Sequence, residues 1–350
     1  MKYLSKWLQG FIAVGVVACF AFQCRAVSLR EVEQVQPFSR QTLRRSSQIF
    51  IFHADEFWLN LHHFLYVLGR AQNKMRDSTR EAVIHAPEDE RQVLAALNAN
   101  EQALWREAVG SYATGLSKKD LVFDAPLPEI TNALARAGSA KSLAGINVEP
   151  NVAAVLTKAA PVYRKGWWPK HHASNKTWQT EIESLVKKYG NPILKFIQKV
   201  YQMEWPAGGY NVHVSGYTNW AGAYSTDGNL LVVSSLDQQV HGSTGLETVF
   251  HEGMHQWDSE VQQALRNQAE RVGKRVPPGL SHSLIFFTAG EAVRRTVPGH
   301  ERYADKFGVW QRGRIRDRDV LEEIWKPYLD GRGTRDQAFA DLIRRLSDGQ

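Results

Sequence analysis

Apolar and polar positions divide the chain into a helical first half and a second half that mixes helices with strands. Apolar residues recur every three to four positions over 57–68 and 90–112, which is the spacing that lines one face of a helix. A stretch rich in Pro, Gly and Trp over 159–169 predicts a connection to the second half. Further helices are expected over 177–189, 192–203, 245–263, 281–297, 318–329 and 334–346.

Strand signals occur in the second half only. Residues 210–217 alternate between apolar and polar side chains, and 230–234 form a second run of residues that favour strands. Asp227-Gly228 between them is a hairpin-turn signal. We therefore predict an α+β fold, mostly helical, in which a small mixed or antiparallel sheet packs on the helix over 245–263.

The first 26 residues have the pattern of an export signal. Lys2 and Lys6 form a basic start, 8–22 an apolar core, and 24–26 a cleavage site. The predicted organisation is a signal peptide over 1–26, a helical N-terminal region over 27–165 and a catalytic domain over 166–350. The protein is then exported, either periplasmic or secreted. The alternatives are membrane attachment through an uncleaved N-terminal segment, or lipid attachment at Cys19.

Composition narrows the chemistry of the exported chain. Both cysteines, Cys19 and Cys24, lie in the signal segment, which excludes a disulfide framework and cysteine peptidase chemistry. Loss of Lys2, Lys6 and Arg25 lowers the basic count from 43 to 40 against 36 acidic residues, a formal net charge of +4. The remaining basic residues are scattered among acidic neighbours without interleaved aromatic residues, which argues against a nucleic-acid partner.

The pentapeptide His251-Glu252-Gly253-Met254-His255 carries the strongest chemical signal. Two histidines four residues apart on a helix face the same way and can share a metal, so Zn²⁺ is the expected cofactor. Glu252 lies about 100° around the helix from His251, beside the metal, which suits a general base. Asp258 is predicted to accept the far ring N–H of a liganding histidine and to orient it; the alternative is a surface aspartate.

The third metal ligand is predicted to be Glu291. It lies in the very apolar stretch 284–293, where a carboxylate needs a metal or a buried partner to offset its desolvation. The small residues Ala289 and Gly290 are expected to let this helix approach the helix over 245–263 closely. That helix carries the pentapeptide and is called the motif helix below. The alternative for Glu291 is an ion pair with Arg295. The other ligand candidates are Glu301 and, less favoured, His282 and His300.

These residues resemble the gluzincins, the thermolysin-like zinc metallopeptidases in which a glutamate on a second helix completes the site. The resemblance covers about 210–305 and implies a mixed sheet whose edge strand lies over the cleft and binds extended peptide. Residues 220–225 stand where that strand is expected, and Gly222 and Ala223 would leave room for a substrate backbone; the alternative is a plain hairpin strand. The resemblance also suggests Tyr303 as the residue that stabilises the oxyanion.

Two shorter likenesses accompany this one. Residues 301–305 resemble the Glu-x-x-Ala-Asp ligand segment of membrane-associated gluzincins, whose transmembrane helices the chain lacks. The string over 287–291, followed by 303–305, is similar to uncharacterised exported bacterial proteins with the same pentapeptide pattern.

Two histidine pairs outside the motif favour structural roles. Adjacent residues on a helix point about 100° apart, so His62 and His63 are expected to make hydrogen bonds in the core instead of sharing a metal. His171 and His172 are expected in a loop, with cleft lining as the alternative.

The function predicted from the sequence is an exported zinc-dependent metallopeptidase acting on a peptide or protein substrate. Water attacks the amide carbonyl and Glu252 serves as general base. The alternatives are a metal-dependent hydrolase of another amide or ester, and a non-catalytic cell-envelope binding protein. Catalysis requires an open fourth coordination position, whereas a structural zinc is closed by four protein ligands.

Overall fold

The computed structural model describes residues 48–73, 88–226, 230–311 and 317–347, and Ser46–Gln350 form one compact unit. The predicted signal peptide over 1–26 and the Asp227-Gly228 turn lie outside the described residues. Within the described ranges, no helix has both the length and the apolar character needed to cross a membrane.

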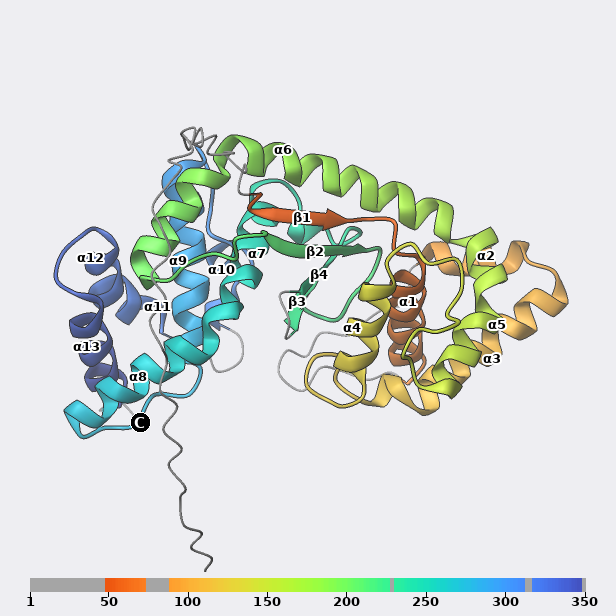
Figure 1. Cartoon of the computed structure of the whole chain (residues 1–350), viewed down its shortest axis with the longest axis horizontal. Coiled ribbons are helices and arrows are strands. Elements are labelled where there is room, and N and C mark those ends of the chain that lie inside the picture. The colour runs from red at the N-terminus through yellow and green to blue at the C-terminus, as the bar shows by residue number, and fades with distance from the viewer. Residues whose placement is uncertain (1–47, 74–87, 227–229, 312–316, 348–350) are drawn as a thin grey trace, which may run out of the picture. The chain divides into compact units, whose positions relative to one another are not determined.

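Four strands form one mixed sheet between the helices (Figure 1). β1 (Phe50–His53), β2 (Tyr210–Ser215) and β4 (Leu230–Ser234) run parallel, and β3 (Ala223–Thr226) is an antiparallel edge strand in the order β1-β2-β4-β3. The register pairs Phe50 with Tyr210, and Ala223 with Val233. The predicted α+β class, mostly helical with a small mixed sheet, is confirmed.

The helices fall into two groups along the chain. The first group is α1 (Phe57–Gln72), α2 (Glu88–Ala96), α3 (Ala99–Thr114), α4 (Leu127–Ala137), α5 (Pro150–Gly166) and α6 (Trp168–Tyr201). The second is α7 (Gly242–Met254), the 3-10 turn η3 (His255–Trp257), α8 (Asp258–Val272), α9 (Leu280–Thr296), α10 (Tyr303–Lys306), α11 (Arg318–Val320), the π-helical η5 (Leu321–Trp325), α12 (Lys326–Leu329) and α13 (Arg335–Ser347).

The sheet separates two hydrophobic cores because successive side chains of a strand point to opposite faces. Val212 and Leu231 point into a core shared with α6, α7 and α9. Leu230 and Val232 point into a second core built by α1, α3, α4 and α5. Both faces of β4 are therefore covered, which explains why its first four residues are all apolar.

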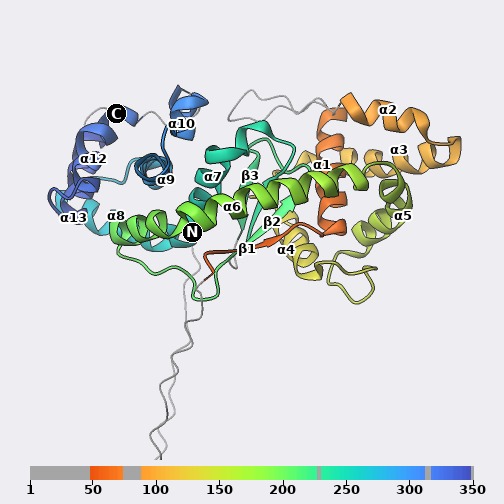
Figure 2. The same cartoon turned by 90° about the horizontal axis from the view of Figure 1, so that it is seen from above.

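Helix α6 connects the two groups (Figure 2). It contacts α5 at one end and β2, α7 and α9 further along. The sequence predicted two helices here with a break before Pro192, but α6 runs through it. Proline removes one helical hydrogen bond, and the buried side chains of Ile193 and Ile197 hold the helix against the core on the far side of that position.

The boundary predicted between 165 and 166 falls inside α5, at its C-terminal end. The expected linker over 159–169 is helical apart from Trp167, which joins α5 to α6. β1 comes from the region expected to be mostly helical, and it pairs with β2. Its four-residue sequence FIFH is too short for a strand period to stand out beside the long apolar run of α1.

Candidate metal centre

His251, Glu252 and His255 lie where α7 passes into a tighter turn. His251 and Glu252 occupy the last turn of α7, and His255 begins η3, which leads into α8. The predicted helix over 245–263 is thus present, with a local 3-10 turn. Gly253 is required inside it because a Cβ there would come within 2.4 Å of the Trp205 indole.

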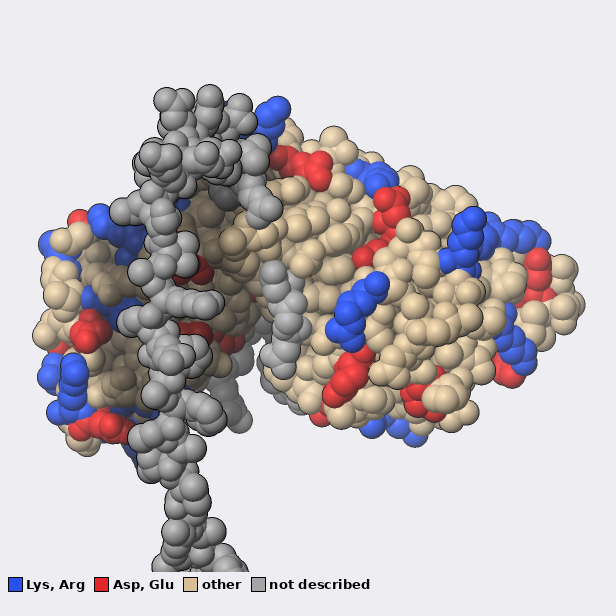
Figure 3. Space-filling model, in the orientation of Figure 1, with Lys and Arg blue, Asp and Glu red and all other residues tan. Residues whose placement is uncertain are grey.

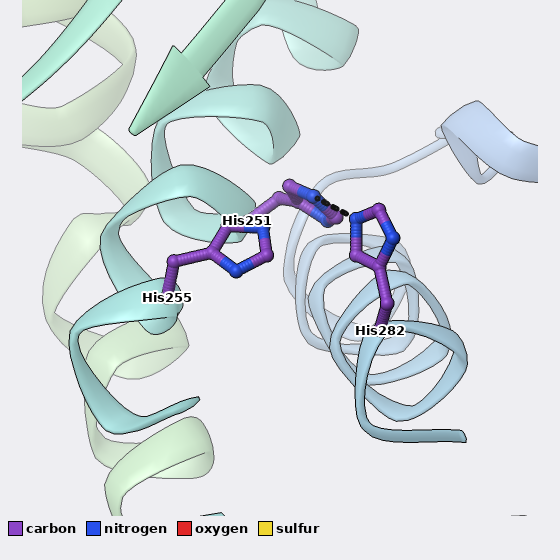
Figure 4. Close-up of side chains that lie close together, drawn as sticks. All are labelled: His251, His255 and His282. Atoms are coloured by element: carbon purple, nitrogen blue, oxygen red, sulfur yellow. Dashed lines mark hydrogen bonds between the residues drawn. The ribbon is translucent and has the colours of Figure 1, made fainter. Parts of the chain in front are cut away.

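A third histidine faces this pair from another helix (Figure 4). His282 lies in the first turn of α9, and its Nε2 is 3.3 Å from Nε2 of His251. The ring centroid of His255 is 5.1 Å from that of His251 and 5.2 Å from that of His282. One nitrogen from each of the three rings lies within 4.8 Å of the others, so the group could hold a metal ion.

The nitrogen separation fits zinc. Two nitrogens bound to one tetrahedral zinc ion at about 2.0–2.1 Å are roughly 3.3 Å apart, and this is the distance between Nε2 of His251 and Nε2 of His282. In the absence of a metal, the same contact is a hydrogen bond in which one ring donates and the other accepts.

Asp258 contacts the ring of His255. Its Oδ2 lies 2.8 Å from Nδ1 of His255. When Nδ1–H donates to this carboxylate, the lone pair of Nε2 is left for a metal. Burial opposes protonation of His255, but the hydrogen bond to Asp258 and the charge of Glu252 outweigh it and raise the pKa of the imidazole above its usual value.

The site is closed on one side and partly open on another. His251 is 6% exposed, whereas the side chain of His255 is 22% exposed. Phe286, one turn after His282 on α9, packs its ring 4.0 Å from the His251 ring and 4.7 Å from the His282 ring, measured between centroids. The histidines therefore have an apolar wall and retain access to solvent.

Glu252 is buried beside the edge strand of the sheet. Ser225 of β3 places its Oγ 2.8 Å from the Glu252 carboxylate oxygen Oε2 and 2.8 Å from the Glu252 backbone oxygen. The carboxylate thus lies between β3 and the motif helix. Sequence reasoning missed Ser225, because a serine next to a tyrosine in a short strand carries no signal of its own.

Glu291, the predicted third ligand, is not brought to the histidines. It follows His282 by nine residues on α9, which places it about 180° around the helix and roughly 13 Å along it. Its fully buried carboxylate accepts hydrogen bonds from Arg294 at 2.8 and 3.0 Å and from Arg302 at 3.2 Å. The alternative pair with Arg295 is also present, at 3.4 Å. The buried partners of Glu291 are therefore arginines, and the third side chain of the histidine group is His282.

Arg302 explains the small residues before Glu291. A Cβ on Gly290 would come within 2.8 Å of the Arg302 side chain, so the glycine makes room for it. Arg302 also donates to Asp305 and to Glu322, both at 2.6 Å. Arg302 belongs to the 301–305 stretch that resembles a ligand segment, and here it fastens α10 and η5 to α9.

Tyr303 lies beside the turn of α7 that precedes His251. Its backbone N–H donates to Glu247 at 2.8 Å and its hydroxyl donates to Gln239 at 3.1 Å. His300, another ligand candidate, bonds the same Glu247 carboxylate at 2.7 Å, and Glu301 is exposed. The oxyanion role of Tyr303 remains a prediction.

Gly222 and Ala223 lie at the start of the edge strand, but both are buried. Gly222 has a φ of +78°, and a Cβ there would come within 2.4 Å of Asp237 Oδ2. The glycine is therefore explained by its backbone conformation and by Asp237. Asp237 occupies the space beside Gly222, so this glycine does not itself leave room for a substrate backbone.

The other histidine pairs make hydrogen bonds within the fold. His62 bonds the Tyr112 hydroxyl at 2.9 Å and His63 the Tyr224 hydroxyl at 2.6 Å, so the structural interpretation of this pair is confirmed. The second pair lies on α6 and not in a loop, with His171 bonded to Tyr163 at 2.8 Å and His172 to Asp55 at 2.6 Å.

A buried carboxyl–imidazole pair was also missed. Glu56, just before α1, and His213 on β2 meet at 2.7 Å and are both almost fully buried. Burial raises the pKa of Glu56 to about 8 and lowers the pKa of His213 to about 3. The two residues are 157 positions apart, and no local pattern links them.

No family model matches the chain, and neither a curated protein nor a solved structure matches it. Function is therefore inferred from the geometry of the histidine group and its neighbours.

Proposed function

We propose that this protein is an exported zinc-dependent hydrolase whose metal is held by His251, His255 and His282. The observation that carries the proposal is the approach of one ring nitrogen from each histidine, from two helices, to within 4.8 Å of the others. Zinc is favoured because imidazole nitrogen is among its preferred ligands, and because the 3.3 Å separation fits its tetrahedral geometry.

The ligand set favours catalysis over a structural role. Three histidines and a water are the ligands of one common type of catalytic zinc, whereas a structural zinc takes four protein ligands. The metal-binding group of the described residues contains three. Zinc bound here would act as a Lewis acid and lower the pKa of a coordinated water to about 7.

Glu252 is the proposed general base. It follows His251 directly on α7, and its carboxylate is buried against β3. In this role it removes a proton from the attacking water and delivers that proton to the leaving group. Asp258 holds His255 in the tautomer that ligation needs.

Peptide hydrolysis is the proposed reaction because an edge strand lies beside the base. β3 pairs with β4 on one side only, in the order β1-β2-β4-β3, and packs against α7. An edge strand can bind an extended peptide through main-chain hydrogen bonds. On the face shown in Figure 3, basic and acidic side chains are interspersed, with no continuous cationic track among the described residues. That distribution suits a peptide better than a nucleic acid.

The proposed ligand set departs from the gluzincin pattern, because its third member is a histidine. Membership of that superfamily is therefore not part of the proposal. Hydrolysis of another amide or an ester uses the same metal and base, and the choice of a peptide depends on β3 alone.

The test is zinc content per folded chain, measured by elemental analysis of wild type, His282→Ala, Glu291→Gln and His172→Ala. His172 is a matched control, since it is a histidine on α6 bonded to Asp55. We expect about one zinc in wild type and in the two variants outside the site, and loss of it in His282→Ala. Cleavage of a quenched fluorescent peptide library by zinc-loaded wild type, but not by Glu252→Gln, then tests the reaction. Folded wild type that binds no transition metal overturns the proposal.

A further inference from the structure

Ser225 bonds the proposed base at two points. Its Oγ lies 2.8 Å from Oε2 and 2.8 Å from the backbone oxygen of Glu252. A hydroxyl has one proton, so it donates to one of these oxygens at a time. The bond to Oε2 holds the Glu252 carboxylate on the side of α7 that faces β3, and the bond to the backbone oxygen holds Ser225 against the helix.

The bond occurs where the motif helix changes its pitch. The backbone oxygen of Glu252 also accepts the N–H of His255, an i to i+3 bond that starts the 3-10 turn η3. Ser225 therefore contacts the same Glu252 backbone oxygen whose bond to the His255 N–H fixes these two residues relative to each other. β3 is in turn held on its other face, where the Tyr224 hydroxyl bonds His63 at 2.6 Å.

We infer that Ser225 is a positioning residue for Glu252 and orients its carboxylate for proton transfer in the proposed reaction. This inference rests on the proposed function. The Ser225 hydroxyl lies on a strand and is already in place when the reaction begins, so no rearrangement is needed to orient the carboxylate. The competing explanation is a tether that fastens β3 to α7 and affects stability alone.

The test compares Ser225→Ala, Ser225→Thr and Glu252→Gln with the control Ser234→Ala. Ser234 is a buried serine of the neighbouring strand β4, and its Oγ donates to the Gly216 backbone oxygen at 2.8 Å. In Ser234→Ala, the Gly216 backbone oxygen still accepts the N–H of Leu236. Three quantities are measured: zinc content, kcat and KM on a quenched fluorescent peptide cleaved by wild type, and the visible absorption spectrum of the Co²⁺-substituted protein.

We expect Ser225→Ala to keep its zinc and its KM and to lose roughly 10–100-fold in kcat, the usual effect of removing a partner that orients a site residue. Ser225→Thr retains a hydroxyl in a residue that suits a strand, and should recover most of the rate. The Co²⁺ spectrum should change in Ser225→Ala and Glu252→Gln and not in Ser234→Ala.

A kcat for Ser225→Ala within twofold of wild type, with an unchanged Co²⁺ spectrum, overturns the inference and leaves the proposed function standing. Failure of zinc-loaded wild type to cleave any peptide, or full activity of Glu252→Gln, overturns the proposed function, and the role of Ser225 with it. If Ser225→Ala does not fold, Ser225→Cys takes its place, because it keeps the size of the side chain and weakens the donor.

Discussion

Nε2 of His282 lies 3.3 Å from Nε2 of His251, although the two residues are 31 positions apart and belong to different helices. One imidazole can donate a single hydrogen bond to the other, but the ring of His255 converges on both of them. One nitrogen from each of the three rings lies within 4.8 Å of the others, and hydrogen bonds among the rings use these nitrogens poorly. A shared cation would satisfy all three.

Zinc is expected to stabilise the folded protein, because it joins α7 to α9 and the three ligands come together only in the folded state. At a free zinc concentration one hundred times Kd, the gain is about 2.7 kcal/mol. Thermal unfolding of wild type should shift upward with zinc and return with a chelator. His282→Ala should show no shift, and a shift equal to that of wild type would remove His282 from the site.

Glu252→Gln is expected to retain zinc and lose roughly 10²–10⁴-fold in kcat, since the amide keeps the size of the side chain but cannot accept the proton. The variant can still accept a hydrogen bond from Ser225, so β3 should stay in place. Zinc content and kcat measured on the same preparation separate loss of the base from loss of the metal. A rate near that of wild type would leave Glu252 as a buried structural residue.

Asp258→Asn is expected to weaken zinc binding by roughly 10–100-fold, because the amide does not fix the tautomer of His255 as a carboxylate does. Competition with a chromophoric chelator measures this change directly. The control is Asp336→Asn, which changes an exposed carboxylate of α13 that pairs with Arg271. An unchanged affinity in Asp258→Asn would make this residue the surface aspartate that was the alternative.

The sequence was sufficient to predict the elements around the site, and insufficient to predict its third member. Periodicity located the motif helix, α9 and β2, and a run of residues that favour strands located β4. His282 and Glu291 both lie on α9, on opposite sides of it, and the choice between them depends on which side faces α7. In the folded chain Arg294 and Arg302 bond the Glu291 carboxylate, and the bond to Arg302 depends on how the chain turns after α9.

The pair of Glu56 and His213 should make stability depend on pH. The pKa of Glu56 is raised from 4.5 to about 8 in the folded state. Its contribution to the free energy of unfolding is therefore complete below about pH 4.5 and is lost as pH rises through 8. The pKa of His213 is lowered from 6.5 to about 3, so its contribution is complete above pH 6.5 and is lost as pH falls through 3. Between pH 6.5 and 8 only the Glu56 contribution changes.

In that interval, Glu56 should lower the free energy of unfolding of the wild type by at most about 1.4 kcal/mol per pH unit. This decrease should be absent in Glu56→Gln. Urea unfolding at pH 6.5, 7.2 and 8 measures the slope in both proteins. Equal slopes would mean that Glu56 does not hold its proton in the folded state.

Glu291→Gln is expected to destabilise the protein without removing the metal. The carboxylate is fully buried and accepts from Arg294, Arg295 and Arg302, and the amide cannot balance their charge. Breaking a fully buried pair from one side costs roughly 3–5 kcal/mol. The loss should fall below that range, because the side chains of Arg294 and Arg295 are partly exposed and Arg302 keeps Asp305 and Glu322 as partners. Urea unfolding should show this loss, while zinc per folded chain stays at the wild-type value. Were the variant to keep its stability and lose zinc, Glu291 would return as a ligand, and α9 would have to turn its opposite face to the histidines of α7.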